Sequence, residues 1–448
     1  MSNFKGIILA AGTGTRMMSS LPKVLHTLSG RPILTYVMNS LVGTGIQDII
    51  TVVPAKHHRF KPILNKTSQL AVQETPKGSG HALLQAIGMT STAKNILVLN
   101  GDMPLIKKET LISLMNHHQS SEADLTLLTA HVRNPKSFGR IVRNEDNRII
   151  TIIEESEANE SHIGIKEINA GAYCFKTSWL WDALKSLKPS KSGEFFLTDL
   201  VSLAYEVNLK TESLSTEEQE ILGVNNKKEL ARVDKILRTS ICEDLMAKGV
   251  TIIDPDTTYI GIDVSVEQDT VIYPNTHISG VSKISSHCEM GPNSVIANSS
   301  VGPNCIIRSS TIESAIVCNN VTVGPYSHIR EGSFLKSDVK IGNYVEIKNS
   351  SIGNGTKLGH HCYIGDSDIG SNVNIGAGTI TCNYDGVQKQ RTIIKDNAFI
   401  GSDTKLIAPV IVGIQSITGA GSVITKDIPD YAKGVGSPAR IIKEDRSS

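Results

Sequence analysis

The chain is poor in aromatic side chains and has no long hydrophobic run. Phe, Trp and Tyr together make up 4% of its 448 residues, which suits a narrow interior without room for rings. No stretch of about eighteen apolar residues occurs, so no membrane-spanning helix is expected. The first residues also lack the features of a signal peptide. These absences predict a protein that is not inserted in a membrane.

The chain also lacks an excess of one charge and paired cysteines. The formal net charge is +1 and no block of like charges stands out, so neither nucleic acid nor a membrane surface is expected as a partner. Anionic small molecules would have to be bound by local groups. The seven cysteines are odd in number and contain no CxxC pair. This pattern favours the reducing cytoplasm.

The sequence is instead rich in one repeat. An aliphatic residue recurs every five or six positions, twenty-one times from Ile260 to Ile375, and the series resumes from Ile394 to Ile424. This period fits neither a helix nor an alternating strand. It is typical of a parallel β-helix, in which each six-residue unit forms one flat side and one corner. The aliphatic residue points inward, and the glycine that often follows it, such as Gly342, is expected to turn the corner. Coils of about eighteen residues, stacked ~4.8 Å apart, predict a prism of about ten coils, on the order of 50 Å long.

Strands and helices alternate in the chain before the repeat. The expected strands are 5–9, 49–53, 96–99 and 125–130, and the expected helices are 32–42 and 80–87. This alternation predicts an α/β, Rossmann-like sheet with ligands at the carboxyl ends of the strands. An amphipathic helix over 227–248 follows, with Gly249 as its stop. We therefore expect an α/β domain over 1–226, a linker helix over 227–249 and a β-helix domain over 250–448, with an irregular tail after about 438.

The first chemical motif is LAAGTGTR (9–16), followed by LPKVL (21–25). A glycine loop after a strand lets backbone N–H groups approach phosphate oxygens, and Arg16 and Lys23 can neutralise the remaining charge. A dinucleotide-binding Rossmann loop is disfavoured because the third glycine is missing and no acid follows the second strand. A Walker A loop is absent. The loop residues expected at the nucleotide are Leu9, Ala10, Ala11 and Gly12.

Asp102 ends the sequence Asn100-Gly101-Asp102, directly after the buried strand 96–99. A carboxylate at this position can face a ligand crevice. Mg²⁺ prefers carboxylate and phosphate oxygens and keeps several waters. Asp102 could equally cap the turn beside Pro104, so the residues alone leave a metal ligand and a structural cap open.

The LAAGxGTR-type loop resembles that of the sugar nucleotidyltransferases. Together with the helix and the long hexapeptide prism, it resembles, over residues 1 to about 440, the family of bifunctional enzymes of UDP-N-acetylglucosamine synthesis. These enzymes join an N-acetylglucosamine-1-phosphate uridylyltransferase, here 1–226, to a glucosamine-1-phosphate N-acetyltransferase, here 250–448. The resemblance implies a left-handed β-helix and a homotrimer with acetyl-transfer sites where subunits meet. It also implies UTP and acetyl-CoA as substrates and Mg²⁺ as cofactor.

The resemblance assigns a role to further residues of the uridylyltransferase half. Mg²⁺ would be held by Asp102 and by Asn225 of GVNN (223–226). The sugar phosphate would attack the α-phosphorus of UTP in line, so catalysis consists of positioning and charge neutralisation by Mg²⁺, Arg16 and Lys23. Residues 74–77 depart from the family pattern. The positions that match the uracil, sugar and N-acetyl contacts are Gln73, Gly78, Ser79, Gly139, Glu154 and Asn169.

One insert interrupts the prism, CNYDGVQKQRTI (382–393). Stacking does not require it, and loops of this kind commonly carry function. The nearby GHHCYIGD (359–366) places His360 and His361 outward in the six-residue register. The resemblance assigns His360 as the general base of acetyl transfer, since a neutral imidazole can accept a proton from the amine at cytoplasmic pH.

Arg330 and Lys348 are one full coil apart, so they can form a local anion site on one side of the prism. The resemblance assigns sugar-phosphate binding to Arg330, Lys348, Tyr363 and Asn374. It assigns acetyl-CoA binding to Ala377, Asn383, Tyr384, Lys389, Ser402 and Ala420, with the Tyr384 N–H at the oxyanion. Where the family has an Arg for the CoA phosphate, this chain has Ser437, and Arg440 is the alternative; the choice stays open.

Two other functions remain possible from the sequence. One is a monofunctional sugar-1-phosphate nucleotidyltransferase whose prism only oligomerises. The length of the prism, the insert and the group of His360, Arg330 and Lys348 disfavour it. The other is a non-catalytic scaffold, which would leave Arg16 and Lys23 without a purpose.

Overall fold

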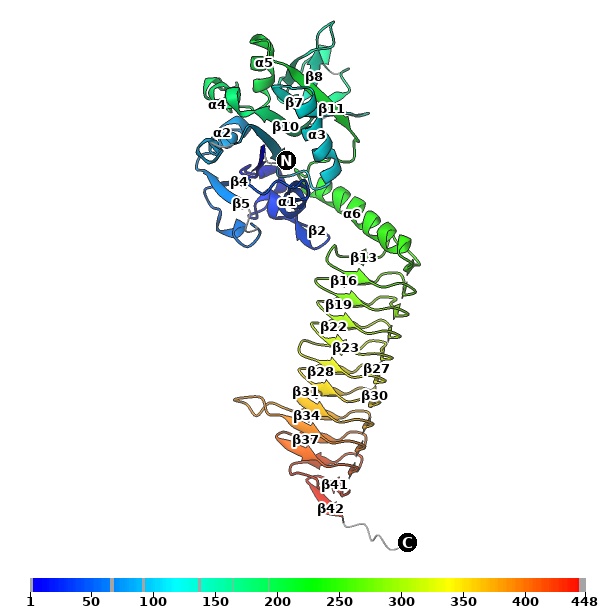
Figure 1. Ribbon diagram of the computed structural model, residues 1–448. Helices are drawn as coiled ribbons and strands as arrows, with labels where there is room; N and C mark the ends of the chain where they lie inside the picture. Colours follow the sequence, from blue (N-terminus) through cyan, green and yellow to red (C-terminus); the bar gives the residue numbers. More distant parts are fainter. Residues whose placement is uncertain are drawn as a thin grey trace. The chain divides into compact units, whose positions relative to one another are not determined.

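The computed structural model describes residues 3–64, 68–90, 93–135, 138–162, 164–191 and 193–442. The chain divides into two compact units, Met1–Leu237 and Arg238–Ser448 (Figure 1). The first unit alternates strands and helices, and the second is a stack of short parallel strands. The predicted fold class, an α/β domain followed by a parallel β-helix, is confirmed.

The first unit is built on a mixed sheet in the order β11-β7-β10-β6-β1-β4-β5, with β8 and β9 beside β10. Its strands are β1 Phe4–Leu9, β4 Ile49–Pro54, β5 Ser68–Gln73, β6 Asn95–Asn100, β7 Leu125–His131, β8 Arg140–Arg143, β9 Ile149–Ile153, β10 Glu167–Lys176 and β11 Thr211–Thr216. β1 is parallel to β4 and β6, whereas β10 is antiparallel to β6 and β7. The carboxyl ends of β1, β4 and β6 therefore meet at one edge, where ligands bind in sheets of this kind.

Helices cover both faces of the sheet because its central strands are apolar on both sides. In β6, Leu97 and Leu99 pack with α1 and α3, while Ile96 and Val98 pack with α2, α4 and α5. Successive side chains of a strand point to opposite faces, so the apolar residues of β6 are buried on both faces of the sheet. The helices are α1 Ile33–Gly43, α2 Ser79–Leu84, α3 Lys108–Ser120, α4 Thr177–Ser186 and α5 Asp199–Glu206. A short hairpin, β2 Thr27–Leu28 and β3 Arg31–Pro32, precedes α1.

The predicted linker helix is α6, Lys227–Ala247. Its first half belongs to the first unit, because Val233 is 1% exposed and packs with Met17, Leu28 and Ile33. In its second half, Cys242 joins the core of the second unit. The division between the units falls inside this helix, after Leu237. Among the described helices, none has both the length and the apolar composition needed to cross a membrane.

The second unit consists of three sheets, in which each strand pairs with the strand three further along the chain, except at the end of the first sheet, where β39 pairs with β41 and β41 with β42 (Figure 1). The first sheet comprises β12 Thr251–Ile252, β15 Val271–Ile272, β18 Glu289–Met290, β21 Ile306–Ile307, β24 Thr322–Val323, β27 Lys340–Asn343, β30 Lys357–His360, β33 Asn374–Ile375, β36 Phe399–Ile400, β39 Ile417–Thr418, β41 Lys433–Gly436 and β42 Ala439–Ile442. The second comprises β13 Tyr259–Ile260, β16 His277–Ser279, β19 Val295–Ala297, β22 Thr311–Glu313, β25 His328–Ile329, β28 Glu346–Lys348, β31 Tyr363–Gly365, β34 Ile380–Cys382, β37 Lys405–Ile407 and β40 Val423–Ile424. The third comprises β14 Ser265–Val266, β17 Lys283–Ile284, β20 Ser300–Val301, β23 Ile316–Val317, β26 Phe334–Leu335, β29 Ser351–Ile352, β32 Ser367–Ile369, β35 Thr392–Ile394 and β38 Val410–Val412.

The repeated aliphatic residues fill the interior of the prism, as predicted. Ile272, Ile296, Ile329 and Ile347 are fully buried. Ile329 pairs with Ile347 one coil later, so equivalent residues lie in adjacent coils and form one continuous core. Outward positions of the same strands are free to carry function.

Most of the glycines that follow the aliphatic residues do not turn the corners, so that prediction is wrong for them; Gly291 and Gly324 are exceptions, with φ of 99° and 104°. The left-handed conformation falls on residues such as Asn275, Tyr326 and Tyr344, and Gly342 does not adopt it. A Cβ on Gly342 would lie 1.9 Å from the carbonyl oxygen of Gly359 in the next coil. Glycine is required there because two coils approach closely, not because the chain reverses.

The tail predicted to be irregular after residue 438 continues as a strand. β42 pairs antiparallel with β41, with Val435 opposite Arg440. Gly436 has a φ of 101° at the turn, a conformation that glycine adopts without strain. A Gly-Ser-Pro sequence between apolar residues is a hairpin signal. Residues 443–448 lie outside the described residues.

Two candidate active sites

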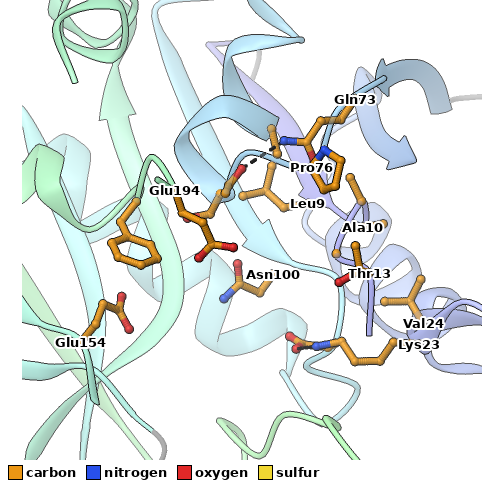
Figure 2. Close-up of a pocket in the computed structure, with 17 residues that line it drawn as sticks. Leu9, Ala10, Thr13, Lys23, Val24, Gln73, Pro76, Asn100, Glu154 and Glu194 are labelled. Carbon is orange, nitrogen blue, oxygen red and sulfur yellow. Dashed lines mark hydrogen bonds and ion pairs between the residues drawn. The ribbon is translucent and has the colours of Figure 1, made fainter. Parts of the chain in front are cut away.

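A polar cavity lies at the carboxyl ends of β1, β5 and β6 (Figure 2). Its volume is about 500 Å³, and an adjoining hollow of about 550 Å³ shares four of its residues, Ser79, Asn100, Asp102 and Glu154. All residues predicted for this half of the chain line the two hollows except Gly101. The Gly101 N–H instead donates to the Leu9 carbonyl at 2.9 Å, so Gly101 joins two strand ends. The cavity thus unites residues that lie far apart in the sequence.

Cations and oxygen ligands converge on one side of this cavity. Lys23 Nζ lies 2.5 Å from Asp102 Oδ2 and 2.9 Å from Asn225 Oδ1. Arg16 Nη2 donates to the same Asn225 oxygen at 3.1 Å. The side chains of Lys23 and Asp102 are only 15% and 19% exposed, so their ion pair is partly shielded from water. The four residues predicted to act on phosphate and metal therefore meet at one point.

This point suits a divalent cation that arrives with a phosphate. Asp102 and Asn225 present oxygens, the ligand type that Mg²⁺ prefers, and they already surround one cation, the Lys23 ammonium. Within the described part of the chain, no group of three or more His, Cys, Asp or Glu side chains is placed to hold a metal ion. The protein would thus contribute two ligands, leaving the others to phosphate and water. The residues present fit that mode of binding.

A buried amide, that of Gln73, borders the opposite side of the cavity, where Figure 2 shows Gln73 above Leu9. Gln73 is 4% exposed, and its Nε2 donates to the Gly78 carbonyl at 3.1 Å and contacts His81 Nδ1 at 2.9 Å. Burial and the nearby Lys77 lower the pKa of His81. The Ser79 hydroxyl accepts the Leu197 N–H at 2.9 Å. Gln73 is therefore held with its carbonyl oxygen available to a ligand.

Glu154 and Asn169 border the adjoining hollow together with Gly139. A Cβ on Gly139 would lie 3.6 Å from Glu154 Oε2 and 3.7 Å from Asn169 Cβ, so the three predicted residues lie together. Burial raises the pKa of Glu154, although the Thr198 hydroxyl donates to its Oε1 at 2.9 Å. Acceptors and amides of this kind suit the hydroxyl and acetamido groups of a sugar.

The first turn of α6 holds Asn225 in place. Glu229 Oε2 accepts the Asn225 N–H at 2.7 Å, and Asn226 Oδ1 accepts the Glu229 N–H at 2.9 Å. The sequence interpretation missed Glu229. An Asn three residues before a Glu at the start of an amphipathic helix resembles a capping box, so a signal was present. The cap ties the start of α6 to the candidate metal ligand.

The second candidate site centres on His360, at the end of β30 in the prism. Its Nδ1 lies 2.5 Å from Asn343 Oδ1 in the preceding coil. An amide oxygen only accepts, so Nδ1 carries a hydrogen, and in the neutral imidazole Nε2 then has the free lone pair. The neighbouring His361 has a φ of 48° and stacks on Tyr344, with ring centroids 5.0 Å apart. The two adjacent histidines therefore differ, and only His360 has the tautomer of a base fixed by a partner.

Arg330 and Lys348 lie in adjacent coils on the second sheet, as the spacing predicts. Arg330 Nη1 is 2.7 Å from Glu346, and Lys348 Nζ is 3.6 Å from Glu331. Lys389 of the insert approaches them, and the proximity of Lys348 lowers the pKa of Lys389. Cations this close repel one another, and an anion between them would relieve the repulsion. Sequence interpretation missed Glu331 and Glu346, because no spacing distinguishes them from solvated surface residues.

The residues predicted for acetyl transfer are spread over two sheets. Tyr363 lies on the second sheet with Arg330 and Lys348, whereas Asn374 lies on the first. Ala377, Ser402 and Ala420 follow strands of the first sheet in successive coils. The Asp403 N–H donates to the Ala377 carbonyl at 2.6 Å, and the Gly421 N–H to that of Ser402 at 2.8 Å. Together they form a column along the prism, which suits an extended ligand.

The insert is a hairpin that leaves the prism after β34 (Figure 1). Tyr384 forms an antiparallel bridge with Lys389, and the Gln390 N–H donates to the Asn383 carbonyl at 2.7 Å. Asn383 is 7% exposed, whereas Tyr384 is 63% exposed. Among the predicted acetyl-CoA residues of the insert, Asn383 is thus buried where the hairpin leaves the prism, and Tyr384 is exposed on the hairpin.

Comparison with known proteins covers both units. A family model described as Nucleotidyl transferase matches residues 5–219, and one described as GlmU-like, C-terminal hexapeptide matches 281–370. The chain is 44% identical to the Bifunctional protein GlmU of Carboxydothermus hydrogenoformans, over 98% of this chain and 99% of that protein. It is 41% identical to that of Clostridioides difficile, over 99% and 97%.

The chain belongs to the GlmU family. This confirms the resemblance stated from the sequence, and with it the prediction of a bifunctional enzyme that joins a uridylyltransferase to an N-acetyltransferase in UDP-N-acetylglucosamine synthesis. The monofunctional alternative loses its support, since the GlmU relatives are matched along both units. The roles of individual residues in this chain remain predictions.

Proposed function

We propose that the first unit transfers uridylyl from UTP to N-acetylglucosamine-1-phosphate with Mg²⁺ as cofactor. The observation that supports this most is the convergence of Arg16, Lys23, Asp102 and Asn225. A phosphate oxygen of the sugar attacks the α-phosphorus of UTP, and the bond to pyrophosphate breaks. Mg²⁺, when bound, would neutralise charge on the phosphates. Lys23 and Arg16 add positive charge, while Gln73 and Glu154 orient the base and the sugar.

The second unit, in this proposal, first acetylates glucosamine-1-phosphate. The amine attacks the thioester carbonyl of acetyl-CoA, and His360 Nε2 accepts the proton that the amine loses. The carbon–sulfur bond breaks, and the proton passes to the leaving thiolate. Arg330, Lys348 and Tyr363 would bind the sugar phosphate, and the Tyr384 N–H would stabilise the oxyanion. The cation cluster and the fixed tautomer of His360 support these roles.

We also propose a homotrimer in the cytoplasm. The candidate acetyl-transfer residues lie on two sheets of one chain, so a neighbouring copy can complete the site. Outward apolar side chains of the last coils, such as Ile380 at 37% and Phe399 at 50% exposure, would be buried in such an assembly. All seven cysteines are free thiols, as a reducing compartment would keep them. Light scattering of the purified protein measures the number of subunits.

A paired assay tests the two activities. Thiol release from acetyl-CoA is measured with glucosamine-1-phosphate, and pyrophosphate release from UTP with N-acetylglucosamine-1-phosphate and Mg²⁺. Both are expected from one preparation, and each should stop when its sugar phosphate is omitted. Pyrophosphate release without thiol release would favour the monofunctional alternative.

Separated units should each keep one activity when the chain is divided at 237/238. The fragment 238–448 should acetylate, and 1–237 should transfer uridylyl. A fragment ending at 226, the predicted domain boundary, loses Val233 from its core and the bond between Asn225 and Glu229. Burial of one valine contributes about 1.5–3 kcal/mol, so 1–226 should melt several degrees below 1–237. Calorimetry of the two fragments compares the boundaries, and equal Tm values would favour 226.

A further inference from the structure

A buried carboxylate, that of Asp366, lies at the base of the insert. Asp366, the last residue of GHHCYIGD, is 8% exposed. Its Oδ1 accepts from Asn349 Nδ2 at 2.6 Å and its Oδ2 from Asn383 Nδ2 at 2.5 Å. Asn349 and Asp366 occupy equivalent corners of successive coils, both with positive φ. The three side chains therefore form a column of amide, carboxylate and amide along one corner of the prism.

Asp366 contacts both ends of the insert. Its carboxylate binds Asn383, where the chain leaves the coil, and its backbone carbonyl accepts the N–H of Thr392 at 3.2 Å, where the chain returns. A second, exposed link joins Arg391 to Asp368 through two contacts of 2.5 Å. The path of residues 383–391 is thus determined at its base, although its tip is exposed.

The carboxylate of Asp366 accepts one hydrogen bond on each of its two oxygens, which an asparagine at the same corner could not do. Asparagine holds the equivalent corner at Asn349 and many others, but an asparagine side chain has only one acceptor oxygen. A carboxylate accepts from two amides at once, so it fixes the orientation of both. The amide hydrogens of Asn383 are thereby turned toward Asp366, which leaves its carbonyl oxygen for a ligand. A buried carboxylate costs desolvation energy unless such bonds satisfy it.

The same corner brings the two substrate regions together. A Cβ on Gly365 would lie 2.5 Å from the Tyr363 hydroxyl and 2.7 Å from Asn383 Nδ2. Tyr363 is assigned to the sugar phosphate and Asn383 to acetyl-CoA, and they meet over this glycine. A shift of Asn383 would therefore change where the thioester lies relative to the amine.

We propose that Asp366 is a positioning residue for acetyl transfer, which fixes the Asn383 amide and the insert against the sugar-phosphate residues. This inference rests on the proposed function, because it takes the insert to bind acetyl-CoA. Asp366 itself touches neither substrate in this account. It acts through Asn383 and through the base of the hairpin.

The test replaces one oxygen of the carboxylate in the full-length protein. Asp366→Asn keeps the size of the side chain and matches the residue found at Asn349, so the coil is expected to fold. Loss of a bond to a charged acceptor costs about 10- to 100-fold in affinity. We expect KM for acetyl-CoA to rise by about that factor, with a smaller fall in kcat. Hydrogen exchange of residues 383–391 should speed up, and pyrophosphate release should not change.

Two further variants complete the experiment. Asp338→Asn is the matched control, since Asp338 also has positive φ and accepts an amide, from Asn320 at 3.1 Å, but is exposed and distant from the insert in sequence. It should leave KM for acetyl-CoA unchanged. The double variant Asp366→Asn with Asn383→Asp exchanges acceptor and donor. It should restore protection of the insert against hydrogen exchange, and this measurement tests the proposal even if the single variant folds poorly.

Asn383→Ala distinguishes a failure of the positioning role of Asp366 from a failure of the proposed function of the insert. If it raises KM for acetyl-CoA while Asp366→Asn does not, the positioning role of Asp366 is wrong and the proposed function stands. If Asn383→Ala also leaves acetyl transfer unchanged, the assignment of the insert to acetyl-CoA fails. Unchanged exchange of the insert in Asp366→Asn would equally overturn the role of Asp366.

Discussion

Replacing His360 with alanine is expected to lower kcat for acetyl transfer by about 10²–10⁴-fold, the contribution typical of a positioned general base. This equals about 3–5 kcal/mol in activation barrier. His360 Nδ1 donates to Asn343, so the lost group is the free lone pair of Nε2. The side chain is exposed, and its removal should hardly change the free energy of unfolding. Thiol release at saturating substrates measures the effect, which should appear in kcat rather than KM.

His361→Ala is the matched control for this prediction. His361 is also exposed, but its ring stacks on Tyr344 and it lies in a corner. Its removal should change acetyl transfer little. Pyrophosphate release should stay at the wild-type rate in both variants, because its candidate site lies in the other unit. Near-normal acetyl transfer by His360→Ala would contradict the assignment, and equal small losses in both variants would give the pair a packing role only.

The prism could be predicted from the sequence because its contacts are local. Each inward residue pairs with the equivalent residue of the next coil, as Ile329 does with Ile347, so one periodic pattern specifies both the fold and the neighbours. The same regularity placed Arg330 beside Lys348. It failed where the coil departs from the pattern, at the corners turned by Tyr326 and Tyr344 and in the hairpin of β41 and β42.

The uridylyltransferase site could not be assembled from spacing in the same way. Lys23 and Asn225 are 202 residues apart in sequence and 2.9 Å apart in space, and no period connects them. The motif residues Arg16, Lys23 and Asp102 were visible because a glycine loop and a strand end indicate phosphate chemistry. Asn225 came from the family resemblance alone, and Glu229, which holds it, was missed.

Side chains that orient other side chains were the hardest to predict. Asn343, Glu229 and Asp366 each bind a candidate site residue rather than a substrate. Glu229 had a signal in its capping-box spacing, but in sequence Asn343 and Asp366 are indistinguishable from solvated polar residues, because register and the path of a loop decide their partners. Such residues nevertheless set the tautomer of His360 and the place of Asn225 and Asn383, on which the proposed reactions depend.

Replacing Asp102 with asparagine is expected to lower uridylyl transfer by at least about 10²-fold, the loss typical when one preorganised charge-stabilising group is removed. The change removes the single carboxylate among the two candidate metal ligands and leaves the Lys23 ammonium without its ion pair. Direct binding of Mn²⁺ in the presence of UTP, followed by electron paramagnetic resonance, should weaken in parallel. Thiol release by the same sample should remain near wild type.

Asp124→Asn is the control that separates catalysis from the loss of an ion pair. The Asp124 side chain is 23% exposed and lies 2.9 Å from Lys176, so it matches Asp102 in burial and in its lysine partner. Asp124 precedes β7, whereas Asp102 follows β6. Both strands are antiparallel to β10 and therefore run in the same direction, so the two carboxylates lie at opposite ends of the strands. Asp124→Asn should keep uridylyl transfer and Mn²⁺ binding, with at most a modest fall in Tm. If both variants lost uridylyl transfer equally, stability and not metal binding would explain Asp102. If Asp102→Asn abolished thiol release as well in a folded protein, the two sites would not be independent.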